Sequence, residues 1–150
     1  MDVFEQLVAA ASNESPVWAS AVLPSHLREQ TAVFSPLAPP RFELGLETVY
    51  EAYLVHYGRP RLFAPGGETE RILLGDYLYA HGLVHIADAG GVHAVAAMAE
   101  LISRCAALRA RGLDGDGQAW IDAASSLGGS PAPPEVQQAL ERHLARVEAV

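Results

Sequence analysis

The chain has 150 residues, of which 50% are hydrophobic, and its 18 acidic and 10 basic side chains give a net charge of −8 at pH 7. This length and apolar fraction fit one compact domain with its own core. All the basic residues are arginine and none forms a basic run, which disfavours nucleic acid and an anionic membrane surface as partners.

Short helices are expected at the N-terminus. Apolar residues at helical spacing predict the first over residues 2–11. Ser15 as an N-cap, followed by Pro16, predicts a second that ends near Leu23. A third short helix is expected within residues 25–33.

A proline-rich segment follows, over residues 35–40, and it cannot be helical throughout because successive prolines remove backbone donors and restrict their neighbours. We expect an elbow there. It would join a small N-terminal helical cap, residues 1–40, to a main helical bundle, residues 41–150, within a single domain.

Longer helices are expected in the bundle, and glycines mark most of their ends. The last of them should carry an amphipathic stripe formed by Val136, Leu140, Leu144 and Val147. Strand signals are nearly absent, so the expected fold class is all-α, an antiparallel helical bundle. The helices are expected over residues 42–57, 68–89, 92–111 and 117–127 and from Pro134 onward.

The single cysteine, Cys105, lies in an apolar helical run, where we expect a small buried hydrophobe in a reducing cytoplasm. No positive charge precedes the first apolar residues, so no signal peptide is expected. No uninterrupted apolar run reaches about eighteen residues, so no transmembrane helix is expected either. The lysine-free, alanine- and arginine-rich composition is typical of a GC-rich bacterial genome.

Three segments, Glu47 to Glu51, Gly58 to Pro60 and Gly75 to Gly82, follow one another at a spacing that resembles the head of the polyprenyl diphosphate synthase family. That family has D-D-x-x-D on one helix, then a basic G-K-P turn, then G-D-Y-L-L-A-R-A opening a later helix. Weaker similarity continues to Leu127. The resemblance implies a bundle equivalent to the N-terminal half of the isoprenoid synthase fold.

In that family the aspartates hold Mg²⁺ ions that bridge the substrate diphosphate. This chain has Glu47, Thr48 and Glu51 in their place, a degenerate acidic motif, and the alternative is that these glutamates are solvated residues of a helix face. Arg59 takes the place of the turn lysine, and Arg59 and Arg61 are the diphosphate-binding candidates. No cofactor is expected, except Mg²⁺ if the acidic motif still binds.

The second aspartate-rich motif of the family has no counterpart, since Asp114 and Asp116 lie in a glycine-punctuated stretch that predicts a turn. Gly75 and Asp76 match the family's helix start. The resemblance therefore implies a non-catalytic protein, either a regulatory or accessory subunit of a prenyltransferase or an isoprenoid binder. Its expected partners are a second copy or a catalytic prenyl diphosphate synthase subunit.

Histidines offer a different chemistry. His81, His85 and Asp88 share one helix face, which could present metal ligands if His56 or Glu47 supplied another. The alternative function is thus a small metal-dependent helical enzyme, and the simpler interpretation is a set of partly buried polar residues. The other histidines, expected at the surface, are His26, His93 and His143.

Other enzyme classes lack their minimal residues, because there is no G-x-S-x-G elbow, Walker-type loop or C-x-x-C pair. A purely structural or assembly role remains a further alternative.

Overall fold

The computed structural model describes residues 1–147, which form six α-helices and no strand, with 73% of the chain helical. The expected all-α class is confirmed. Three single 3-10 turns lie between α2 and α3, at Ser25–Leu27, Ser35–Leu37 and Pro40–Phe42. The helices are α1 (Val3–Glu14), α2 (Pro16–Ala21), α3 (Glu43–Tyr57), α4 (Glu68–Ala110), α5 (Asp116–Ser126) and α6 (Pro133–Leu144).

The predicted cap of α2 is present, since Ser15 Oγ accepts a hydrogen bond from the Val17 N–H at 3.1 Å and Pro16 occupies the first turn. The helix predicted over residues 25–33 is wrong. Only one 3-10 turn forms there, because the backbone donors that follow are used elsewhere. The Glu29 N–H donates to the Arg61 carbonyl at 3.1 Å, and the Val33 N–H donates to Glu47.

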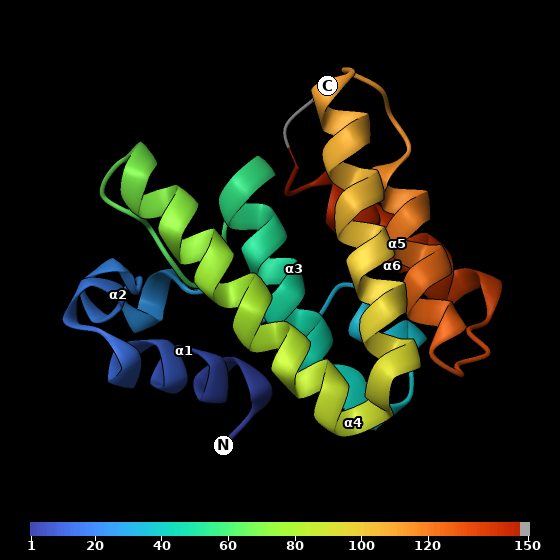
Figure 1. The fold of residues 1–150 in the computed structure, drawn as a ribbon, viewed down its shortest axis with the longest axis horizontal. Coiled ribbons are helices and arrows are strands. Elements are labelled where there is room, and N and C mark those ends of the chain that lie inside the picture. The colour runs from blue at the N-terminus through green and yellow to red at the C-terminus, as the bar shows by residue number, and fades with distance from the viewer. Residues whose placement is uncertain (148–150) are drawn as a thin grey trace.

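α3 and the first half of α4 pack side by side and run antiparallel (Figure 1). Glycines bring them into close contact: a Cβ at Gly82 would lie 2.6 Å from Val49 Cγ2, and one at Gly45 would lie 2.7 Å from Ile86 Cδ1. Side chains larger than hydrogen would push the helices apart, so these glycines set the separation of the two helices.

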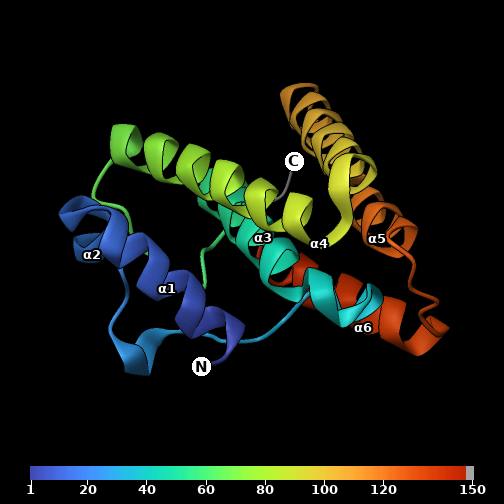
Figure 2. The same ribbon diagram turned by 60° about the horizontal axis from the view of Figure 1, so that its bottom comes forward.

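α4 bends sharply at Gly91, where two separate helices were expected. The φ of Gly91 is 72° and its ψ is −161°, a conformation open essentially to glycine alone. The chain nevertheless continues as a helix on both sides, and Figure 2 shows the second half of α4 leaving at a steep angle toward α5. Because of this bend, α4 contributes side chains to two separate parts of the core.

The core has two parts along α3. α1 and α2 lie over one part, where Phe4 and Leu7 pack with Leu74 and Leu78 of α4. The second half of α4, α5 and α6 surround the other part, around the fully buried Trp120. Figures 1 and 2 show these groups on opposite sides of α3 and the first half of α4.

Leu37, in the segment expected to be an elbow, lies in this core, as do the two residues that precede the segment. Val33, Phe34 and Leu37 are each at most 1% exposed, and Phe34 stacks on Trp120 at a ring separation of 5.3 Å. This stretch of the connection between the cap and the bundle is therefore packed in the part of the core around Trp120.

The amphipathic stripe predicted for the last helix is partly wrong. Val136, Leu140 and Val147 pack against the core, but Leu144 is 62% exposed. The fully buried side chain on this turn is His143, since a helical period that starts at Val136 and Leu140 reaches position 143 as readily as position 144.

Within residues 1–147, one helix, α4, has the length and apolar composition to cross a membrane, and 22% of its most apolar stretch is buried. Length and composition alone are weak grounds for a span, because core helices pass the same test. The expected absence of a transmembrane helix stays a prediction.

Candidate functional site

The acidic motif lies at the centre of the protein. Every residue from Gly45 to Val55 is buried, because other helices and the segment around Phe34 enclose α3 on all sides. Glu47 and Glu51 are therefore 0% exposed, and Thr48 is 1% exposed. The interpretation of these glutamates as solvated residues is wrong.

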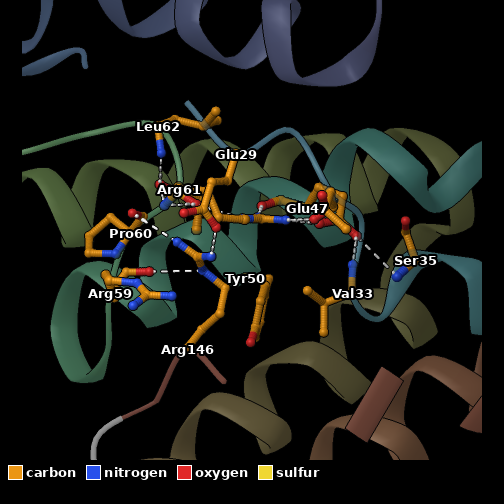
Figure 3. Close-up of polar contacts among 12 residues, drawn as sticks. Glu29, Val33, Ser35, Glu47, Tyr50, Arg59, Pro60, Arg61, Leu62 and Arg146 are labelled. Carbon is orange, nitrogen blue, oxygen red and sulfur yellow. Dashed lines mark hydrogen bonds and ion pairs between the residues drawn. The ribbon is translucent and has the colours of Figure 1, made fainter. Parts of the chain in front are cut away.

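Arg61 binds both carboxylates from the loop that follows α3 (Figure 3). Its Nη1 donates to Glu47 Oε1 at 2.5 Å and its Nε donates to Glu51 Oε1 at 3.0 Å. The remaining guanidinium contacts go to the carbonyls of Thr31, at 2.9 Å, and Glu47, at 3.2 Å. The fully buried guanidinium thus joins α3, its following loop and the segment around Thr31, which precedes the 3-10 turn Ser35–Leu37.

Backbone N–H groups occupy the other carboxylate oxygens. Glu47 Oε2 accepts from Val33 at 3.3 Å and from Ser35 at 3.2 Å, as Figure 3 shows. Glu51 Oε2 accepts from Arg61 at 3.0 Å and Leu62 at 2.9 Å. Each carboxylate oxygen therefore has a donor within the protein, which is the condition for burying such a charge.

The electrostatics of this cluster are coupled. Burial alone would lower the pKa of Arg61, but the charges of Glu47 and Glu51 outweigh burial and raise the pKa above its usual range. Arg61 therefore stays a cation. The rings of Phe4 and Tyr50 lie 5.2 and 5.1 Å from its guanidinium carbon and add cation–π contacts.

These contacts bear on two expectations about the site: that Arg61 binds a diphosphate and that the acidic motif could bind Mg²⁺. Arg61 is fully buried and held by both glutamates, so it is not available to bind a diphosphate. Thr48 donates its hydroxyl to the Leu44 carbonyl at 2.7 Å, an ordinary bond within a helix. A Mg²⁺ ion could reach Glu47 and Glu51 only by displacing Arg61 and four backbone donors.

Arg59, the other diphosphate-binding candidate, is exposed at the turn. The turn itself is covered by the C-terminal segment: Arg146 Nε donates to the Arg59 carbonyl at 3.0 Å and Arg146 Nη2 donates to the Pro60 carbonyl at 3.2 Å (Figure 3). A Cβ at Gly58 would lie 2.5 Å from the Arg146 carbonyl oxygen. The Gly-Arg-Pro sequence is thus explained here by chain packing.

Gly75 and Asp76 do not mark a helix start, because α4 begins at Glu68. Gly75 lies inside the helix, where its missing side chain leaves room for the His56 ring. Asp76 Oδ1 lies 3.5 Å from His56 Nε2. This interaction raises the pKa of His56, but burial has the larger effect and the net change is a decrease.

His81 and His85 lie together on α4, with ring centroids 4.8 Å apart and the planes at 84°. The structure does not bring the additional ligand that the metal-dependent alternative requires. His56 faces Gly75 and Glu47 is held by Arg61. Within residues 1–147, no group of three or more His, Cys, Asp or Glu side chains is placed to hold a metal ion.

A second buried polar cluster was not predicted from the sequence. His143, expected at the surface, is 0% exposed, and its Nδ1 lies 2.8 Å from the Tyr50 hydroxyl. Its Nε2 lies 3.3 Å from Asp116 Oδ1, an ion-pair distance without the alignment of a hydrogen bond. Asp116 also accepts from the Tyr53 hydroxyl at 2.5 Å and from Arg109 Nη2 at 2.8 Å.

Asp116 is the first residue of α5, so the turn expected around it ends there. Its side chain is buried. Burial would raise its pKa, but the interactions with His143, Tyr53 and Arg109 outweigh burial and hold the pKa well below its usual range. The burial of His143 could have been predicted from the helical period of α6, which places His143 on the same face as Val136 and Leu140.

Three other expectations concern single residues. Cys105 is buried, as predicted, and burial raises the pKa of its thiol to about 12. His26 and His93 are exposed, also as predicted.

Three surface pockets formed by residues that the structure describes are small. One of about 190 Å³ lies between the second half of α4 and α5, lined by Leu101, Arg104 and Asp122 among others. Two more, of about 220 and 240 Å³, lie beside Pro39 and beside Arg41. Pockets that enclose a drug-sized ligand usually exceed roughly 300 Å³.

Comparison of the chain with protein families, with curated proteins and with solved structures found no match.

Proposed function

We propose that this protein is a non-catalytic relative of the polyprenyl diphosphate synthases and acts as an accessory subunit of a catalytic prenyltransferase. The single observation that carries the non-catalytic part is the fully buried Arg61, which binds both Glu47 and Glu51. Prenyl transfer separates a diphosphate leaving group from an allylic cation, and metal ions or cationic groups must stabilise the leaving charge. Here both acidic residues are already paired with a cation of the same chain.

The relationship itself is supported by the three sequence segments and by the arrangement of their helices. The helix that carries Glu47 and the helix that carries Gly75 are antiparallel neighbours, as the N-terminal half of an isoprenoid synthase bundle would require. The proposal also places the protein in a bacterial cytoplasm.

The accessory role is supported by exposed apolar side chains along α4. Leu73 is 54% exposed, Val84 is 56% exposed and Val92 is 82% exposed. Apolar side chains grouped on one helix often mark a protein interface. An isoprenoid-binding role receives less support, because these three pockets are smaller than typical ligand sites.

The test combines binding and activity. The tagged protein is mixed with a catalytic prenyl diphosphate synthase subunit from the same genome, and the complex is isolated and assayed with labelled isopentenyl diphosphate, an allylic primer and Mg²⁺. We expect no turnover by the protein alone, co-purification of the two subunits, and an altered rate or product length in the complex.

Variants test whether the exposed apolar side chains of α4 form the interface with the catalytic subunit. Leu73→Glu combined with Val84→Glu should abolish co-purification, whereas Gln138→Glu, at an exposed position of α6, should leave it intact. Turnover by the isolated wild type would contradict the non-catalytic assignment, and failure of the wild type to co-purify would contradict the accessory role.

A further inference from the structure

His81 and His85 are spaced four residues apart in the regular first half of α4, so they project from the same face one turn apart. Their rings are in edge contact, at 4.8 Å between centroids. Two imidazoles at this spacing on one helix can ligate a single ion, as in the helical H-E-x-x-H zinc motif.

Neighbouring rings fix the position of His81. The ring of Tyr77, one turn earlier, stacks on His81 at 5.5 Å with planes 16° apart, and Trp18 of α2 packs against Tyr77 at 6.1 Å. Packing that orients a ligand before the ion arrives reduces the cost of binding.

The local charge also favours a cation. Asp88, one turn beyond His85 on the same helix, is exposed and adds a negative charge beside the pair. Both histidines are partly exposed, so an ion and its remaining water ligands can reach them. Glu47 and Glu51 are not available to an ion in the same way, since they are buried and already paired with Arg61.

We propose that His81 and His85 form a two-imidazole binding site on α4 for a borderline transition-metal ion such as Zn²⁺ or Cu²⁺, with Asp88 as the adjacent positioning carboxylate. Imidazole ligands favour these ions over Mg²⁺, and Cu²⁺ should bind more tightly than Zn²⁺. Two protein ligands leave the other coordination positions to water. The site is independent of the proposed accessory role, because the isolated protein should bind the ion without a partner.

The experiment is calorimetric titration of the purified full-length protein with Zn²⁺ and, separately, with Cu²⁺. We expect one ion per chain. His81→Gln and His85→Gln should each weaken Zn²⁺ binding by more than about tenfold, and Asp88→Asn should weaken it by about tenfold, the lower end of the roughly 10–100-fold that outer partners typically contribute. The control is the double variant His26→Gln, His93→Gln, which removes two exposed histidines outside the pair and should bind like the wild type.

Electron paramagnetic resonance of the Cu²⁺-loaded wild type gives a readout that does not depend on variant stability. Coupling to two imidazole nitrogens is the expected spectrum. The proposal is overturned if one imidazole or none is coupled, if His85→Gln binds Zn²⁺ like the wild type, or if the His26 and His93 control loses binding to the same extent.

Discussion

Arg61 gives the acidic motif, Glu47 to Glu51, a structural role in the protein interior. It holds two carboxylates that would otherwise repel each other in the interior, and those carboxylates in turn hold the backbone at Val33, Ser35 and Leu62. Burying three ionised groups is costly, so the geometry of their contacts decides whether the protein folds.

Removal of this guanidinium should therefore be severe. Arg61→Ala leaves Glu47 and Glu51 buried without a counter-charge, and we expect the free energy of unfolding to fall by about 3–5 kcal/mol. Arg59→Ala is the matched control: its side chain is exposed and makes one long contact, 3.4 Å to the Ala145 carbonyl, so the change should stay within about 0.5 kcal/mol. Urea unfolding followed by circular dichroism measures both, and equal losses would contradict the assigned role.

Asp116 makes stability depend on pH. Its pKa in the folded protein lies below the unfolded value of 3.8, so the unfolded chain binds the proton more readily in acid. The stability contributed by Asp116 is thus fully present above that unfolded value and is lost as the pH falls through the folded value.

We expect Asp116→Asn to cost about 1.5–3 kcal/mol at pH 7 and less at pH 3, because at pH 3 the unfolded wild-type chain already binds a proton at Asp116 and the folded protein does not. Asp122→Asn is the control, since Asp122 is exposed and bonds only at the surface, to Gln118 and at 4.0 Å to Arg104. The measurement is the unfolding free energy of the three proteins at both pH values. A deficit of Asp116→Asn that is the same at pH 3 and pH 7 would rule out this linkage.

At the scale of elements, α4 joins the two parts of the core because it bends at Gly91. Nothing lies within 4 Å of a Cβ built at Gly91, so the need for glycine there comes from its backbone conformation alone. Gly67 is equally open, but its φ of −172° is an extended value that any residue adopts.

These two glycines form a matched pair. Gly91→Ala should lower the free energy of unfolding by about 1–3 kcal/mol, because it forces a side chain into a glycine-only conformation. Gly67→Ser is the control and should leave it unchanged or raise it by a few tenths, because Gly67 is the N-cap of α4 and serine caps a helix at least as well as glycine. Thermal unfolding of both variants is the check, and an unchanged midpoint for Gly91→Ala would show that α4 does not require this bend.

Helix boundaries followed from local signals in the sequence, whereas the environment of each helix did not. Ser15-Pro16 and Gly58 were sufficient to place helix ends, because caps and glycine stops act within a few residues. The burial of Glu47, Glu51 and His143 was missed, since it depends on Arg61 and Asp116, partners that meet them only in the folded chain. The Gly75 segment matched a helix-start pattern, yet the structure uses this glycine for contact between helices.

For the molecule as a whole, the N-terminal cap and the bundle should unfold together. The buried connection through Phe34 and the Arg61 cluster links both parts of the core. Trp18 reports on the cap and Trp120 on the bundle, so single-tryptophan variants, Trp120→Phe and Trp18→Phe, separate the two signals. In each variant we expect the fluorescence and circular dichroism midpoints to coincide, as for a two-state domain. Distinct midpoints would mean that residues 1–40 form a separate unit.

The central claim is that Glu47 and Glu51 bind Arg61 and do not bind a metal–diphosphate complex. Calorimetric titration of the wild-type protein with Mg²⁺ in the presence of inorganic diphosphate tests it directly, because the family's chemistry requires this pair of ligands at the acidic motif. We expect no saturable heat beyond dilution. Saturable binding of about one Mg²⁺–diphosphate per chain that is lost in folded Glu47→Gln protein would contradict it.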